Sequence, residues 1–182
     1  MKLTTTGGDN TALGRRSLCV NTTGGNNTSI GAYNMTSNTT GVGNVAVGIQ
    51  ALCSNTTASC NTAVGLDALK ANTTGCRNVA MGSLAGDANT TGDCNVAIGF
   101  GALSTATTAD HNTMVGAGAG SSTTTGAGNT AVGRCSMTEN TTGANNVAVG
   151  QQALEDNTTG AYHTAVGVAV SYTHLTLPTR LS

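Results

Sequence analysis

Six cysteines and three histidines are the side chains of this sequence best suited to bind a metal ion or to form disulfides. There is no C-x-x-C pair, and the histidines, His111, His163 and His174, are scattered along the chain. Metal sites need closely spaced ligands. Acid–base or nucleophilic catalysis needs an acid pair or a set such as Ser-His-Asp, which we also do not find. We therefore expect a non-enzymatic protein with no catalytic, cofactor or metal site, in which the cysteines fill space.

Glycine-rich stretches and N-x-T triplets offer two further kinds of chemistry. G-A-G-A-G at 116–120 and G-F-G at 99–101 could suggest phosphate binding, but neither comes with G-K-[ST] or a strand–loop–helix context. The N-x-T triplets are formal glycosylation acceptors. They return at a fixed interval, and sugars on successive stacked segments would clash. We interpret both features as structural.

A seventeen-residue repeat dictates the elements that must position these residues. Units begin every 17 residues from Asn10 to Asn146, and a partial tenth unit begins at His163. The consensus is N-[TV]-A-V-G-x-x-A-L-x-x-N-T-T-G-x-x, with no residue gained or lost between units. Position 5 is glycine in all ten units: Gly14, Gly31, Gly48, Gly65, Gly82, Gly99, Gly116, Gly133, Gly150 and Gly167. Position 12 is asparagine in seven of nine units: Asn21, Asn38, Asn55, Asn72, Asn89, Asn140 and Asn157.

Charged residues inside the repeats occupy only positions 6, 7, 10, 11, 16 and 17. Burying an unpaired charge is costly, so we expect these six positions to face solvent. A disordered, low-complexity linker has no reason to segregate its charges in this way, which makes it the weaker alternative. No position is rich in Asp, which argues against a calcium-binding nonapeptide solenoid.

Each unit has the composition of one coil of a parallel β-solenoid. The N-V-A-V stretch is too short for a helix and its β-branched residues favour a strand, and we expect the A-L pair at positions 8 and 9 to form a second short strand. Gly at position 5 and N-T-T-G at 12–15 favour turns, because glycine adopts a positive φ freely and asparagine tolerates it. Coils stacked at about 4.8 Å make a rod about 45 Å long. We expect the repeated Asn and Thr side chains to form hydrogen-bonded ladders along it.

Both faces of the N-V-A-V strand are apolar or small. Positions 2 and 4 share one face, and the alanine at position 3 points the other way. One face can cover the inside of the coil, and we expect the other to meet another chain, because a half-exposed strand would alternate apolar with polar residues. The sequence therefore predicts a homo-oligomer.

The same stacking separates most of the cysteines. Cys19 and Cys53 lie two coils apart, as do Cys60 and Cys94, and two coils span about 9.5 Å, too far for a disulfide. Cys76 lies one coil from both Cys60 and Cys94, which leaves one bridge open there.

The units N-V-A-V-G-x-x-A-L and N-T-A-V-G-x-x-A-L resemble the head repeats of trimeric autotransporter adhesins, the YadA-like heads. They resemble still more the seventeen-residue arrays of phage and bacterial tail-fibre proteins. The resemblance covers Asn10 to about Ala169. It implies a left-handed parallel β-roll in which three chains pack around an axis, and a role in adhesion or host recognition with a cell-surface receptor or glycan as partner. It implies a place in a virion tail fibre or at the cell surface. The sequence shows no signal peptide, coiled-coil stalk or membrane anchor, which favours the tail-fibre family.

Composition limits the other partners. The net charge of −1 gives no electrostatic reason to bind nucleic acid, and no apolar run approaches the roughly 20 residues that span a bilayer. We expect neither nucleic-acid binding nor membrane insertion. We divide the chain into a lead-in at 1–9, a solenoid at 10–169 and a tail at 170–182. The tail's V-S-Y-T-H-L-T-L-P-T resembles a translated sequencing adapter, so we expect the tail to be non-native.

Ice binding is the alternative function. Some antifreeze proteins are Thr-rich β-solenoids, and positions 13 and 14 are Thr in all nine units that reach them. Because adjacent residues of an extended segment point to opposite sides, we expect only one of the two Thr positions to face outward, which disfavours a flat ice-binding face.

Overall fold

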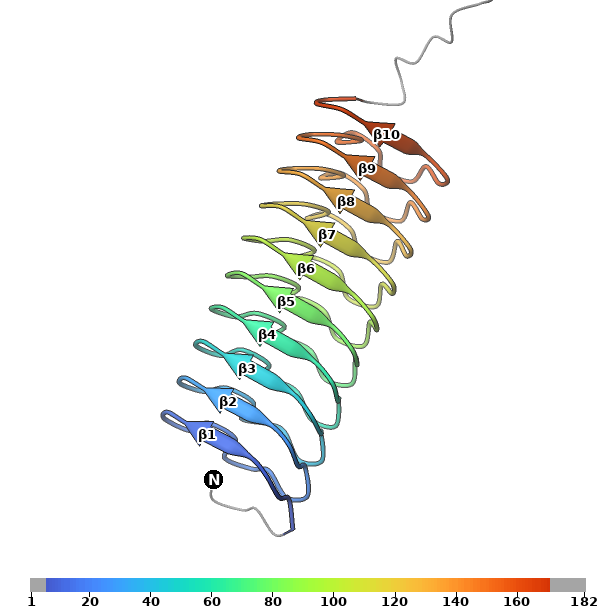
Figure 1. Ribbon diagram of the computed structural model, residues 1–182. Helices are drawn as coiled ribbons and strands as arrows, with labels where there is room; N and C mark the ends of the chain where they lie inside the picture. Colours follow the sequence, from blue (N-terminus) through green and yellow to red (C-terminus); the bar gives the residue numbers. More distant parts are fainter. Residues whose placement is uncertain (1–5, 171–182) are drawn as a thin grey trace, which may run out of the picture.

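A computed structural model describes residues 6–170, so the expected tail lies outside the described residues except for Val170. The described chain is an all-β rod of coils stacked along one axis (Figure 1). One three-residue strand from each repeat contributes to a ten-stranded parallel sheet whose order follows the sequence. The strands are β1 (Thr11–Leu13), β2 (Thr28–Ile30), β3 (Val45–Val47), β4 (Thr62–Val64), β5 (Val79–Met81), β6 (Val96–Ile98), β7 (Thr113–Val115), β8 (Thr130–Val132), β9 (Val147–Val149) and β10 (Thr164–Val166).

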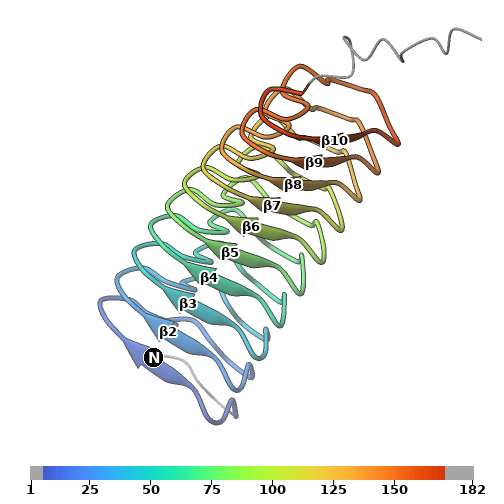
Figure 2. The same cartoon turned by 45° about the horizontal axis from the view of Figure 1, so that its top comes forward.

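The register of the sheet equals the repeat length. Val47 of β3 lies opposite Val64 of β4, and every other strand pair has the same offset of 17 residues. Figure 2 shows that the chain winds through successive coils, each with its strand on the same side. The predicted parallel β-solenoid of seventeen-residue repeats is therefore confirmed.

The expected second strand at positions 8 and 9 is wrong. Within residues 6–170, positions 6 to 11 form turns in every complete unit, except that Ile49 and Gln50 of the third unit are bends. Ala51 and Leu52 are neighbours in sequence and both are fully buried. Side chains of an extended strand alternate, so two adjacent inward residues require a backbone that curls. It does so because Leu52 has a positive φ of 51°, and the other leucines at position 9 have similar values.

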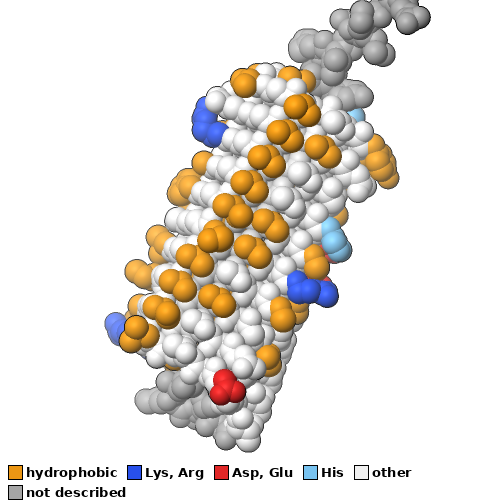
Figure 3. Space-filling view, viewed as in Figure 1, with side chains coloured by type: hydrophobic (Ala, Val, Ile, Leu, Met, Phe, Trp, Pro, Cys, Tyr) orange, Lys and Arg blue, Asp and Glu red, His pale blue; other side chains and the backbone are white. Residues whose placement is uncertain are grey.

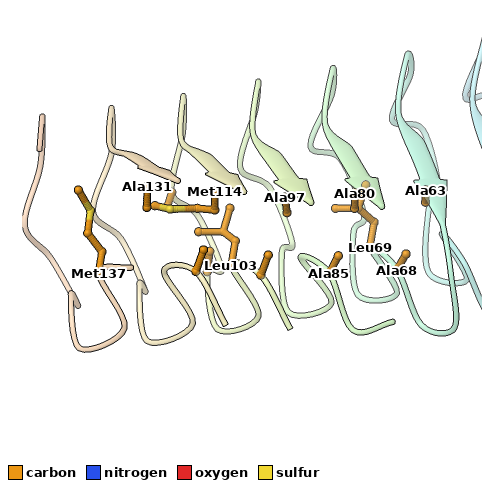
Figure 4. Close-up of a cluster of buried hydrophobic side chains, with 14 of the residues drawn as sticks. Ala63, Ala68, Leu69, Ala80, Ala85, Ala97, Leu103, Met114, Ala131 and Met137 are labelled. Atoms are coloured by element: carbon orange, nitrogen blue, oxygen red, sulfur yellow. The ribbon is translucent and has the colours of Figure 1, made fainter. Parts of the chain in front are cut away.

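A narrow column of small and medium side chains forms the core. Position 3 of each strand points inward, and the alanines at this position meet the buried residues of positions 8 and 9, which include Leu69, Leu103 and Met137 (Figure 4). One unit exchanges the sizes, because it has Met114 at position 3 and Gly120 at position 9. A Cβ added to Gly120 would lie 2.7 Å from the sulfur of Met114. Met114 thus occupies the space that leucine fills in other coils.

Position 5 can hold only glycine. The glycines of this position have φ between +122° and +138°, a region that is essentially closed to other residues. The backbones of successive coils also approach closely here. A Cβ added to Gly65, for example, would lie 2.5 Å from the carbonyl oxygen of Gly82. Each coil therefore reverses direction at position 5 with its backbone against that of its neighbours.

We expected asparagine at position 12 to favour a turn because it tolerates a positive φ. The chain does bend directly after these residues, but these asparagines do not adopt a positive φ. The non-glycine residues with positive φ lie at positions 7, 9 and 17, among them Gln50, Leu52 and Cys60. None of the position-12 asparagines has a positive φ. These asparagines stabilise the coil through hydrogen bonds of their side chains, which are described below.

Candidate functional surfaces

The asparagines of position 12 form a ladder of buried hydrogen bonds. The amide nitrogen of Asn38 donates to Oδ1 of Asn21 at 2.9 Å, and Asn55 donates to Asn38 at 2.8 Å. The same bond joins Asn72, Asn89 and Asn157 to the asparagine of the preceding coil. Each amide nitrogen also donates to the carbonyl three residues later, as in Asn55 to Ala58 at 3.1 Å. These nitrogens are the atoms that N-glycosylation would modify, and they are occupied inside the coil.

A second asparagine ladder, at position 1, was visible in the sequence only as the start of each unit. Oδ1 of Asn44 accepts from the backbone N–H of Asn61 at 3.0 Å. Nδ2 of Asn44 donates to the carbonyl of Ala58 at 2.8 Å, fourteen residues later. The carbonyl at position 15 therefore accepts from both asparagines of its coil. The signal that could have revealed this role is the recurrence of Asn at position 1 in nine of ten units.

Both threonine positions lie on the outside of the rod. Every Thr at position 14 is exposed, and no Thr at position 13 is buried. The hydroxyl of Thr39 donates to the carbonyl of Thr56 at 3.1 Å, and Thr56 donates to Thr73 at 3.0 Å. The expectation that the two positions point to opposite sides is wrong, because the segment bends between the buried positions 12 and 15. We call the surface formed by positions 13 and 14 the Thr corner.

The outward face of the sheet is an uncharged, largely apolar strip along the rod, with aliphatic residues or Met at position 4 and Thr or Val at position 2. Positions 2 and 4 point outward, and the hydrophobic ones among them form lines that follow the axis (Figure 3). At position 4, Ile30 is 37% exposed and Met81 is 44% exposed. No charged residue occurs at positions 2 to 4 in any unit. We call this surface the strand face.

Charged side chains avoid both the core and the strand face. No charged residue in the described part of the chain is fully buried, as predicted from their positions, but Asp67 and Asp87 are only partly exposed and each has one buried carboxylate oxygen. Lys70 pairs with Asp67 at 3.4 Å, and the guanidinium of Arg15 lies 5.2 Å from the centre of the Tyr33 ring. Burial raises the pKa of the Asp87 carboxyl above its ordinary value, and nearby Asp67 adds to the effect.

The side chains best able to bind a metal ion or to form disulfides are dispersed along the rod. Cys19, Cys53, Cys60, Cys76, Cys94 and Cys135 are all free thiols. No group of three or more His, Cys, Asp or Glu side chains within residues 6–170 could hold a metal ion. The glycines of the 99–101 and 116–120 stretches lie at positions 5, 7 and 9 of their coils, in turns rather than before a helix. Among the described residues, no helix is long and apolar enough to cross a membrane.

Three comparisons with known proteins found no match. No protein-family model, no curated protein and no solved structure matches this chain.

Proposed function

We propose that this chain is a non-enzymatic segment of an adhesive or host-recognition fibre, assembled as a homo-oligomer through its strand face. The observation that carries the proposal is the strand face itself: an uncharged, largely apolar strip that runs along the rod. The variable positions 6, 7, 10, 11, 16 and 17 remain outside and present the surface that meets a receptor or glycan. The resemblance to adhesin heads and tail-fibre arrays adds a three-fold, left-handed arrangement to the proposal.

The composition of the strand face suits an interface between copies of the chain. Positions 2 to 4 span about 10 Å, so a rod about 45 Å long offers a strip of roughly 450 Å² per chain before the relief of the side chains is counted. Stable interfaces bury about 800 Å² per partner, and their cores are depleted of charge, as this strip is. The exposed Ile30 and Met81 side chains belong to this strip, and covering them would remove apolar area from water.

The test is the molar mass of the 182-residue chain in solution, measured by light scattering during size-exclusion chromatography. We expect a trimer. The double variant Val47→Lys with Met81→Lys places two charges on the strand face, two coils apart, and should yield monomers with an unchanged circular dichroism spectrum. The control is Thr57→Lys with Thr91→Lys, which carries the same charges on the Thr corner of the same two coils. It should stay trimeric. A folded wild-type monomer would overturn the proposal.

Ice binding is a second candidate function, which the exposure of both threonine positions favours. The Thr corner presents two parallel rows of threonines, and neighbours within a row are about 4.8 Å apart, the spacing of the coils. The hydroxyls at position 13 are held in place because each donates to the carbonyl of the next threonine in its row, as in Thr39 and Thr56. Thermal hysteresis of the wild-type chain is the direct measurement. The Thr57→Lys with Thr91→Lys variant should abolish the activity, and the strand-face variant should retain it. Absence of hysteresis in the wild-type chain eliminates this function.

A further inference from the structure

Departures from the repeat concentrate in the sixth and seventh units. Gly101 and Gly118 are the only glycines at position 7 in the ten units, and Phe100, at position 6, is the only phenylalanine of the chain. The same two units lack asparagine at position 12, where they have Ala106 and Thr123. A regular repeat offers the same surface on every coil, so a localised binding site can arise only where the repeat changes.

The two glycines open a groove on the surface. It has a volume of about 440 Å³ and is lined by Leu84, Asp87, Phe100, Ser104 and Ser121 together with Gly101 and Gly118. A Cβ added to Gly101 would meet no atom within 4 Å. The groove lies over positions 6, 7 and 10, on the turn side of the coils, and therefore not on the strand face. Its volume is within the range of about 300–1,000 Å³ that is usual for small-molecule sites.

The lining combines an aromatic surface with neutral and acidic hydrogen-bonding groups. Phe100 is 63% exposed, and its ring face attracts the weakly positive C–H groups of an apolar ligand surface. Ser104 donates its hydroxyl to the Ser121 carbonyl at 3.5 Å and can still accept, Ser121 can donate and accept, and the Asp87 carboxylate only accepts. Oδ1 of Asp87 is buried and has no hydrogen-bond partner among the described residues, so a ligand in the groove would donate to the other oxygen of this carboxylate. The described residues that line the groove include no Lys or Arg, which disfavours anionic ligands.

We propose that this groove binds a neutral hexopyranose unit of a glycan. A pyranose ring has one C–H face that can stack on Phe100 and a rim of hydroxyl groups. Those hydroxyls can donate to Asp87 and exchange hydrogen bonds with Ser104 and Ser121. The proposal deepens the recognition role proposed above and rests on it for its biological meaning, but sugar binding is measurable whatever the oligomeric state.

The experiment is saturation-transfer-difference NMR with the full chain. The probes are the methyl pyranosides of glucose, galactose and mannose and the corresponding neutral N-acetylhexosamines. At least one should receive saturation, mainly at its C–H protons. Phe100→Ala should weaken binding at least tenfold and Asp87→Asn several-fold. Alanine is tolerated at position 6, because Ala32 and Ala117 occupy it in other coils, so the Phe100 variant should fold. Leu66→Ala changes the same position two coils away and should bind like wild type.

Two results would overturn the proposal that the groove binds a sugar: no saturation transfer to any probe, or equal affinity of the wild type and Phe100→Ala for the sugar. The molar mass of the same samples keeps the two proposals apart. A trimer that binds no sugar refutes only the sugar-binding proposal. A monomer that binds sugar refutes only the proposed assembly.

Discussion

Oδ1 of Asn89 is buried without a hydrogen-bond partner, and Ala106 occupies the ladder position one coil later. Asparagine there would donate to Asn89, as Asn72 does to Asn55 at 3.1 Å. It would also offer an acceptor to the buried, unpaired hydroxyl of Thr123. Since a net hydrogen bond contributes about 0.5–1.5 kcal/mol, Ala106→Asn should raise the free energy of unfolding by about 1–2 kcal/mol in urea denaturation. Ala88→Asn, at the outward position 11 of the preceding coil, is the control, and an equal gain there would refute the ladder explanation.

The exchange of sizes between Met114 and Gly120 predicts non-additive mutations. Met114→Ala should destabilise the chain by about 2–5 kcal/mol because it leaves a cavity, and Gly120→Leu should destabilise it by about 1–3 kcal/mol through overpacking. The double variant restores the arrangement of the other coils, including a leucine at the positive φ that position 9 adopts elsewhere. Its unfolding midpoint should return close to that of wild type. Additive losses in the double-mutant cycle would show that the two side chains do not share one space.

Replacing a glycine at position 5 should break the contact between coils. Gly65→Ala forces a side chain into a φ of +138° and places its Cβ 2.5 Å from the Gly82 carbonyl oxygen. Backbone strain of this kind costs about 1–3 kcal/mol even without a clash, so the variant should lose at least this much stability or fail to fold. Gly8→Ala is the matched control, because its Cβ would meet nothing within 4 Å. Similar melting curves for the two variants would contradict this account.

The raised pKa of Asp87 gives a pH dependence with a definite sign. The folded chain holds the Asp87 proton more tightly than the unfolded chain does. Ionised Asp87 therefore lowers stability at neutral pH, and this loss disappears as pH falls through the folded-state pKa. Asp87→Asn should be more stable than wild type at about pH 7, and the difference should shrink towards about pH 3. A difference in unfolding midpoint that is constant or grows on acidification would contradict the assignment.

The constant repeat length made the coil and its register predictable, because Val47 and Val64 can pair only if every residue has its equivalent 17 positions away. The expected second strand was wrong because pattern alone does not reveal that Leu52 adopts a positive φ. The Thr corner was misjudged for a related reason, since alternation applies to extended chain and not to a bend. The groove beside Phe100 could not be foreseen, because it depends on side chains that are missing from two neighbouring coils.

The uniform offset of the hydrogen bonds has a consequence for how such a rod can change its length. Duplicating the codons of one whole unit would insert a coil that meets familiar surfaces above and below, and would extend the molecule by about 4.8 Å. An insertion whose length is not a multiple of 17 residues would shift the position-5 glycines against bulky neighbours and interrupt both asparagine ladders. Reach is therefore adjustable in discrete steps, and a genetic change that respects the period alters it while leaving the packing intact.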